Sequence, residues 1–283
     1  MYKFDLHLHT TASDGSDTPS ELLALAREAG LEVISITDHD TLAGCIEAIN
    51  IPQNDVKIIT GIEFSCHYSN DEDFDCHILG YGFDVNSPEL VAAINHGREM
   101  RLAKLNARLE YLECRHGIKF SEEEISWLYS LNSAAKPHLA QLIVKRGCAD
   151  GISDAIDKYL KGDGFPDDRI DAALAIRAII SAGGIPVYAH PLGGEREKRL
   201  TKEELIPRVK ALKSVGLMGM ECYYSRYSSL DEAMLSQIAE ENGLYVSAGS
   251  DYHGKNKTVV LGRLCSDADI DIPKASLLSA VLG

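Results

Sequence analysis

The chain lacks several features that would assign it to common protein classes. Among its 283 residues, no apolar run approaches the ~20 residues of a membrane-spanning helix, and the charged, strand-like first residues do not form a secretory signal. Its seven cysteines form no CxxC pair, and an odd number suits a reducing cytoplasm better than a disulfide framework. We find no internal repeat and no low-complexity segment. We therefore expect a cytoplasmic globular protein without membrane contact.

Positive charge is also scarce. The 28 Lys and Arg residues against 43 Asp and Glu residues give a formal net charge of -15. Broad electrostatic binding to long DNA or to an anionic membrane needs a basic surface, so we do not expect such partners. A small phosphorylated ligand stays open, because one metal cluster can reverse the local sign of the charge.

What the sequence does contain is a series of strand-like runs separated by helical patterns. The runs cover residues 4–9, 33–39, 57–66, 76–83, 185–190, 218–224 and 245–253, and most are apolar, as parallel strands buried on both faces are. Ser/Thr-x-x-Glu pairs, which favour helix starts, occur at Thr18 and Glu21, Ser121 and Glu124, Thr201 and Glu204, and Ser229 and Glu232. Seven strands with crossover helices indicate an α/β fold, either a β/α barrel or a doubly wound sheet.

One long stretch interrupts this rhythm. Residues 98–168 contain helical stretches such as REMRLAKLNARLEYLECRHG and DGISDAIDKYL and no convincing strand. We therefore predict a helical insertion over 98–168, within a β/α domain formed by residues 1–97 and 169–283.

Histidines and carboxylates gather at the ends of the predicted strands. In DLHLHT the side chains of Asp5, His7 and His9 share one face of the strand, because strand side chains alternate. Similar residues follow at Asp38 and His39, Glu63, His77, His190, Asp251 and His253. In a β/α barrel these strand ends would meet at one mouth, where active sites are built.

So many ionisable groups are costly to bury without a counter-charge, and a metal cluster supplies one. Imidazole and carboxylate ligands without thiolates favour Zn, Mn, Fe or Co over Mg alone. Glu63 is a carboxylate able to bridge, which implies at least two ions. Two adjacent metals are a device for hydrolysis, in particular for attack at phosphorus.

The motifs DLHLHT, SITDHDT, GIEFS, AHP and GSDYHG resemble those of the PHP family, the polymerase and histidinol phosphatase hydrolases, from residue 4 to about 263. KPHLAQLIVKRG and ECYYSRYS further resemble the branch of nucleoside 3',5'-bisphosphate phosphatases, which are related to exoribonucleases that trim short RNA from the 5' end. The resemblance implies a distorted (β/α)7 barrel of the PHP type, with the helical insertion over the active-site mouth. It also implies two or three divalent metal ions, manganese above all, with zinc or iron as the other choices.

Carried over residue by residue, the resemblance implies three ligand sets. One metal would be held by His7, His9, Glu63 and Asp251, a second by Glu63, His77 and His190, and a third by Asp14, His39 and His253. Asp14 stands where some phosphatases of the family have histidine, which leaves the occupancy of the third site open. Asp5, Asp38 and Asp40 are candidates for orienting the ligands, although the last two would also serve as helix caps.

The expected reaction is attack of a metal-bridging hydroxide on phosphorus. His39 or His253 would donate a proton to the leaving sugar oxygen, unless a third metal stabilises that oxygen instead, and we count Asp251 with these catalytic residues. The turn Asn132-Ser133-Ala134-Ala135-Lys136-Pro137-His138 leads into a helix N-terminus, so Lys136 and His138 are candidates for binding a second phosphate. Ser225 and Arg226 are further phosphate candidates, and Tyr223 or Tyr224 could stack on a base.

These features predict a phosphatase that removes the 3'-phosphate of nucleoside 3',5'-bisphosphates such as pAp, with AMP-like nucleotides and short RNA 5' ends as its ligands. A small-metabolite phosphatase, for example one acting on histidinol phosphate, would use the same metals. An amidohydrolase that cleaves C–N bonds also opens with an HxH strand, but often bridges its metals with lysine rather than a glutamate such as Glu63. A non-catalytic module of the same fold should have lost ligands, and no expected strand-end residue is missing.

Overall fold

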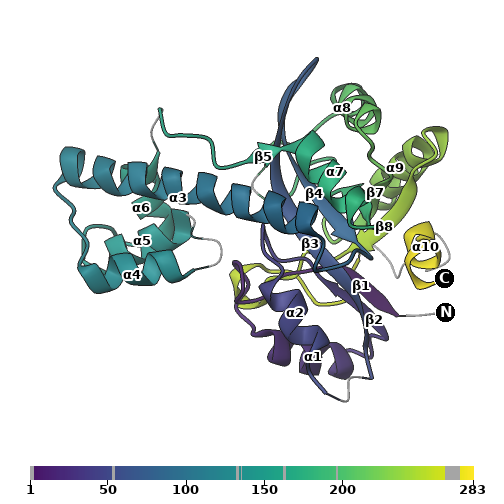
Figure 1. Cartoon of the computed structure of the whole chain (residues 1–283), viewed down its shortest axis with the longest axis horizontal. Helices are drawn as coiled ribbons and strands as arrows, with labels where there is room; N and C mark the ends of the chain where they lie inside the picture. Colours follow the sequence, from purple (N-terminus) through teal and green to yellow (C-terminus); the bar gives the residue numbers. More distant parts are fainter. Residues whose placement is uncertain are drawn as a thin grey trace. The chain divides into compact units, whose positions relative to one another are not determined.

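A mixed sheet of parallel and antiparallel strands organises the fold (Figure 1). The computed structural model describes residues 3–52, 55–131, 134, 136–161, 164–195, 197–264 and 275–283. The main path of the sheet runs in the order β1-β2-β3-β4-β6-β7-β8. These strands are β1 (Phe4–Leu8), β2 (Val33–Ile36), β3 (Lys57–Ser69), β4 (Asp73–Tyr81), β6 (Ile185–Tyr188), β7 (Gly219–Tyr224) and β8 (Tyr245–Gly249).

The sheet curls into a nearly closed barrel. Leu8, at the end of β1, forms a parallel bridge with Tyr252, which lies just beyond β8, so the first and last strands of the path approach each other. This arrangement confirms the predicted α/β fold with a barrel-shaped sheet and excludes the doubly wound alternative.

The strict alternation of strand and helix fails at one place. Strands β3 and β4 pair antiparallel as a hairpin, so no crossover helix lies between these two strands, and β4 is also antiparallel to β6. An additional short strand, β5 (Ile170–Asp171), pairs with β3 and was not predicted. The expected count of seven strand–helix units is therefore not confirmed.

The strands are buried because helices pack against the face opposite the histidines. All five residues of β1 and all four of β2 are buried. Leu8 and Ile34 belong to one apolar cluster with Leu22 and Leu23 of helix α1 (Pro19–Glu28). The alternation in DLHLHT thus places leucines in the core and leaves the imidazoles for the opposite face.

The other helices of the barrel are α2 (Ala43–Ile49), α7 (Ala172–Ser181), α8 (Lys202–Ser214), α9 (Ser229–Glu241) and α10 (Ser276–Leu282). The predicted capping boxes at Thr18 and Thr201 are present. The pair predicted for α9 is wrong by one residue, because Ser228 caps this helix together with Asp231. The observed pair ends in aspartate rather than in the glutamate of the predicted pattern, but it likewise places an acidic side chain three residues after a serine.

The described part of the chain divides into two compact units by its contacts. The barrel unit comprises Met1–Ala93 and Ile170–Gly283, and the helical unit comprises Ile94–Arg169. Helix α3 (Pro88–His116) begins in the first and continues in the second, which also holds α4 (Glu122–Ser130), α5 (Lys136–Lys145), α6 (Ile152–Ala155) and the π-helical turn η1 (Ile156–Leu160). Leucines of α3, α4 and α5 form its apolar core. The insertion boundaries inferred from sequence, 98 and 168, stay a prediction.

Among the helices in the described residues, none is both long enough and apolar enough to cross a bilayer. The six cysteines that lie in these residues are all free thiols.

Candidate metal centre

Histidines from separate strands meet where β1, β2, β6 and β8 end. His7 lies on β1, and His9 follows that strand directly. Glu63 lies on β3 and His77 on β4, whereas His39, His190, Asp251 and His253 follow strands β2, β6 and β8. Asp14 lies in the loop after β1. The structure thus places all nine predicted ligand residues in one neighbourhood of the barrel unit, and their role as ligands stays a prediction.

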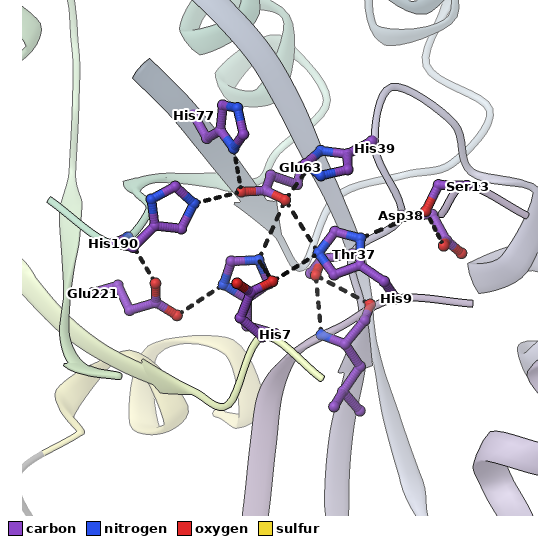
Figure 2. A network of polar contacts seen from close by, with 12 residues as sticks. His7, His9, Ser13, Thr37, Asp38, His39, Glu63, His77, His190 and Glu221 are labelled. Atoms are coloured by element: carbon purple, nitrogen blue, oxygen red, sulfur yellow. Dashed lines mark hydrogen bonds and ion pairs between the residues drawn. The ribbon is translucent and has the colours of Figure 1, made fainter. Parts of the chain in front are cut away.

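Glu63 lies at the centre of this group (Figure 2). Its Oε2 is 3.3 Å from His7 Nε2, 3.1 Å from His9 Nε2 and 3.1 Å from His39 Nδ1. Its Oε1 is 2.9 Å from His77 Nδ1 and 3.2 Å from His190 Nε2. Each of the two carboxylate oxygens of Glu63 therefore faces a different set of imidazoles, which is the geometry of a bridging ligand.

The charge state of Glu63 agrees with that position. The side chain is 1% exposed, and burial by itself would favour the neutral acid. The charges of His39, His7 and His77 outweigh the burial and hold the pKa of Glu63 well below its ordinary value. The site therefore favours an ionised carboxylate surrounded by electron-pair donors.

The imidazole nitrogens of the site fit divalent ions. His7 Nε2, His9 Nε2, His39 Nδ1 and His253 Nε2 are buried and have no hydrogen-bond partner. Atoms that share one ion at about 2.0–2.2 Å from each lie roughly 3–3.4 Å apart, close to the separations around Glu63. Buried polar atoms are normally satisfied, so these unpaired nitrogens point to a missing partner that accepts their lone pairs.

The possible ligands fall into three overlapping groups, in which one donor atom from each residue lies within 4.8 Å of the others. These groups are His7, His9 and Glu63; His39, Glu63 and His77; and His9, Asp14, His39 and His253. The first group contains three of the four ligands expected for the first metal. The third group contains all three ligands expected for the third metal, together with His9. In the second group, His39 takes the place expected for His190. His190 nevertheless contacts Oε1 of Glu63, the oxygen that His77 also contacts.

Glu221 is a functional candidate that sequence reasoning missed. It is fully buried on β7, its Oε1 lies 2.9 Å from His7 Nδ1, and its Oε2 accepts the backbone N–H of His190 at 2.7 Å. Burial lowers the pKa of His7, but the charges of Glu221, Glu63 and Asp251 raise it well above the ordinary value. A hydrogen on His7 Nδ1 bound by Glu221 leaves Nε2 as the coordinating nitrogen.

Lys257 and Tyr224 hold the far oxygen of Asp251. The Lys257 ammonium lies 2.7 Å from Asp251 Oδ2, and the Tyr224 hydroxyl donates to the same atom at 2.8 Å. The other oxygen, Oδ1, faces His9 Nε2 at 3.5 Å. Tyr224 is fully buried, so it does not provide the base-stacking surface considered from the sequence, and Tyr223 is also buried.

Asp5, Asp38 and Asp40 accept hydrogen bonds from backbone N–H groups. Asp5 accepts the backbone N–H groups of Ser250 and Gly262, both at 2.9 Å, and burial raises its pKa to about 6. Asp38 binds Thr10 and Ser13 in the loop that follows β1, and Asp40 accepts the N–H of Ser65. In these contacts the three carboxylates fix the chain segments that carry the predicted ligands.

Backbone strain is concentrated at the centre. Among the described residues other than glycine, positive φ occurs at Asp40 (54°), His190 (26°) and Asp251 (60°). Each follows a strand of the site, and such conformations persist where the surroundings over-determine them. At Gly249, which precedes Asp251 by two residues, a Cβ atom would lie 2.1 Å from the Cβ of His7. A glycine is therefore required where β8 passes His7.

The predicted phosphate-binding residues lie in different parts of the chain. Arg226, after β7, pairs with Glu195 at 2.9 Å, and the neighbouring Ser225 Oγ is buried without a hydrogen-bond partner. Lys136 and His138 begin helix α5 in the helical unit. Residues 132, 133 and 135 of the predicted anion-binding turn lie outside the described residues.

Comparisons with known proteins agree with this centre. The PHP domain family matches residues 5–186. A 5'-3' exoribonuclease of Haemophilus influenzae is 31% identical over 96% of this chain and 97% of its own. The phosphoribosyl 1,2-cyclic phosphate 1,2-diphosphodiesterase of Eggerthella lenta is 32% identical over 89% of this chain and 94% of its own. The 3',5'-nucleoside bisphosphate phosphatase of Chromobacterium violaceum is 29% identical over 89% of this chain and 88% of its own.

A solved structure supports the same grouping. The structure of a candidate metal-dependent phosphoesterase from Bifidobacterium adolescentis superposes with a TM-score of 0.76 and 28% sequence identity, covering 93% of this chain and 92% of that chain.

Proposed function

We propose, from the premise that this chain belongs to the PHP domain family, that it is a metal-dependent phosphoesterase that removes the 3'-phosphate of nucleoside 3',5'-bisphosphates. The observation that carries the proposal is the position of Glu63, with one oxygen facing each of two sets of imidazoles whose nitrogens are partly unpaired. This arrangement suits two adjacent divalent ions. The bisphosphate phosphatase among the relatives supports the choice of substrate.

The metal ions, for which we propose manganese, would be held by the ligand sets inferred above. His7, His9, Glu63 and Asp251 would hold one, Glu63, His77 and His190 a second, and Asp14, His39 and His253 a third. Bound divalent ions make water nucleophilic at neutral pH and neutralise charge on a phosphoryl group.

Where no third ion is bound, we propose that the chain itself supplies the proton for the leaving sugar oxygen; a bound third ion would stabilise that oxygen instead. His253 Nε2 lies 3.1 Å from Asp14 Oδ1, and His39 Nε2 lies 4.0 Å from Asp14 Oδ2, so one carboxylate contacts both candidate acids. We propose that one of these two imidazoles donates to the departing oxygen. Asp251 contributes by orienting His253, whose Nδ1 is 3.4 Å from Asp251 Oδ1.

For the remainder of the substrate we propose the contacts inferred from sequence. Lys136, His138, Ser225 and Arg226 would bind the second phosphate or the sugar. Arg226 carries an ion pair with Glu195, so a phosphate that binds there must share or displace this carboxylate. We also propose that the enzyme works in the cytoplasm and accepts short RNA 5' ends, in keeping with the named exoribonuclease relative.

The test is release of inorganic phosphate by the manganese-loaded protein from adenosine 3',5'-bisphosphate, 3'-AMP and 5'-AMP. We expect rapid release from the bisphosphate alone, and loss of both activity and bound metal in Glu63→Ala. Glu240→Ala, at an exposed position of α9, should behave as the wild type. A protein that binds manganese but releases phosphate from none of these substrates would overturn the nucleotide assignment.

The relative from Eggerthella lenta suggests a second candidate, because that enzyme is named for its action on a cyclic phosphodiester. Phosphoribosyl 1,2-cyclic phosphate therefore belongs in the same assay, together with histidinol phosphate. Preferential hydrolysis of either would replace the bisphosphate and keep the metal centre. Cleavage of a C–N substrate instead would contradict the phosphoesterase assignment itself.

A further inference from the structure

Five cationic side chains gather inside the helical unit, although the chain as a whole has a net charge of -15. Three of them, Arg101, Lys104 and Arg108, occupy positions i, i+3 and i+7 of helix α3 and therefore share one face. Lys136 opens helix α5, and Arg169 is the last residue of the unit. Only Lys136 was singled out from the sequence.

Arg108 is the most deeply buried member. Its side chain is 6% exposed, and its guanidinium carbon lies 5.6 Å from the ring centroid of Phe165. Its Nε is buried and has no hydrogen-bond partner. An unpaired donor on a buried charge is costly, so a partner that brings acceptor oxygens would stabilise this position.

The five cations outnumber the carboxylate of Asp168, which pairs with members of the cluster. Asp168 binds Lys104 at 2.6 Å and lies 3.9 Å from Arg169. Burial lowers the pKa of Lys136, and repulsion from Arg108 and Lys104 lowers it further, more strongly than the attraction of Asp168 raises it. An added anion would therefore be attracted to Lys136 and its neighbours.

We propose that these five residues form a phosphate-binding site within the helical unit. Guanidinium groups match the oxygens of a phosphate with paired N–H donors, and lysines add point charges. The choice of phosphate over other oxyanions rests on the proposed function. The site itself does not, because it needs neither the metal ions nor the barrel residues.

The test is calorimetric titration of the full chain without added metal. The probes are adenosine 3',5'-bisphosphate, inorganic phosphate and adenosine, which lacks phosphate. Arg108→Gln removes the buried charge, and Arg101→Gln removes a more accessible one in case the first variant folds poorly. Lys158→Gln is the matched control, since this exposed lysine of the same unit pairs with Asp154, which, within the described residues, is not a partner of the five cations.

We expect each arginine variant to raise the Kd for the bisphosphate roughly tenfold or more, as loss of a hydrogen bond to a charged group implies. Lys158→Gln should leave the Kd unchanged, and adenosine should not bind at the site. Inorganic phosphate binding as tightly as the bisphosphate would identify a free anion as the ligand. Much weaker phosphate binding would identify a nucleotide. Folded Arg108→Gln and Arg101→Gln proteins with wild-type Kd values would overturn the site.

Turnover separates this proposal from the proposed function. If the site binds the second phosphate of the substrate, Arg108→Gln in the manganese-loaded enzyme raises KM for the bisphosphate with little change in kcat. If the arginine variants bind the bisphosphate more weakly but the wild-type enzyme turns over no nucleotide, the phosphate-binding site is supported and the proposed function is contradicted. If the enzyme turns over the bisphosphate and both arginine variants keep the wild-type KM and Kd, the proposed function is supported and the phosphate-binding site is contradicted.

Discussion

At the scale of single residues, the contact between Glu221 and His7 Nδ1 favours Nε2 as the nitrogen of His7 that is available to a metal. Histidine coordinates through a ring nitrogen that carries no hydrogen, and the hydrogen bond made by the other nitrogen selects that tautomer. Because Glu221 also binds the backbone N–H of His190, one carboxylate positions both His7 on β1 and His190 just after β6.

We predict that Glu221→Gln lowers manganese affinity roughly 10- to 100-fold, the usual effect of losing a partner of a metal-ligating histidine. Glutamine has nearly the same shape but offers an N–H₂ group that can face His7 Nδ1 and favour the wrong tautomer. Affinity is measured by competition with a chelator. Glu240→Gln serves as the control, and wild-type affinity in Glu221→Gln would show that Glu221 has no part in orienting His7.

The candidate metal-binding histidines could be predicted from the sequence, but the residues that hydrogen-bond to them and orient them could not. His7, His9, Glu63 and His190 stand in short motifs with a recognisable spacing, and the fold brings them together where strands end. Glu221 is a single polar residue within the apolar run MGMECYY, and its partner His7 is 214 positions away. Lys257 lies beyond the motif GSDYHG altogether. Such contacts depend on strand register and loop path, which local patterns do not specify.

At the scale of elements, helix starts were the best-determined local feature. Thr201 accepts the N–H of Glu204 while the Glu204 side chain accepts the N–H of Thr201, so both donors at this helix start are satisfied. We predict that Thr201→Ala lowers the free energy of unfolding by about 1 kcal/mol. Thermal or urea unfolding measures it, with the exposed Thr258→Ala as a comparison. An unchanged midpoint would show that α8 is held by its packing alone.

The β3–β4 hairpin shows where element prediction failed. Both strands were recognised, but the turn residues 70–72 of the sequence were not read as a hairpin, and parallel order was assumed throughout. The short β5 could not be predicted, because a two-residue strand carries no periodicity and exists only through pairing with Cys66 and His67 of β3.

The pairing of Asp168 with α3 has a pH signature. Burial alone would raise the pKa of Asp168, but the hydrogen bond and charge of Lys104 and the charge of Arg101 hold it below 3.8. The folded state therefore binds fewer protons than the unfolded state, so this stabilisation is complete above about pH 4 and is lost as the pH falls through the folded pKa.

We accordingly predict that Asp168→Asn destabilises the protein at pH 7, and that the difference from the wild type shrinks as the pH falls below about 4, where the wild-type carboxyl is protonated too. Unfolding curves for both proteins across this pH range measure the effect. A difference that stays constant with pH would show that it arises from shape rather than from the charge of Asp168.

At the scale of the whole molecule, charge limits the substrates. A net charge of -15 repels polyanions at distances beyond the predicted metal centre, while that centre and the proposed phosphate site in the helical unit would attract phosphates locally. Repulsion should therefore grow with every phosphate that remains outside these two attractive regions. Composition gave this property directly, whereas the placement of the five cations in one cluster emerged only from the folded helical unit.

We predict that kcat/KM falls as a 5'-phosphorylated RNA is lengthened beyond a few nucleotides, and that this decline becomes shallower at higher ionic strength. Added salt shortens the screening length from about 30 Å at 0.01 M to about 8 Å at 0.15 M, and so weakens repulsion from the surface more than contacts made at close range. The measurement is a length series assayed with the manganese-loaded enzyme at both salt concentrations. For adenosine 3',5'-bisphosphate, which has no chain beyond the site, salt should instead reduce kcat/KM. A long strand that is bound and cleaved as well as a short one at low salt would mean that an attractive path for the RNA backbone outweighs the net charge.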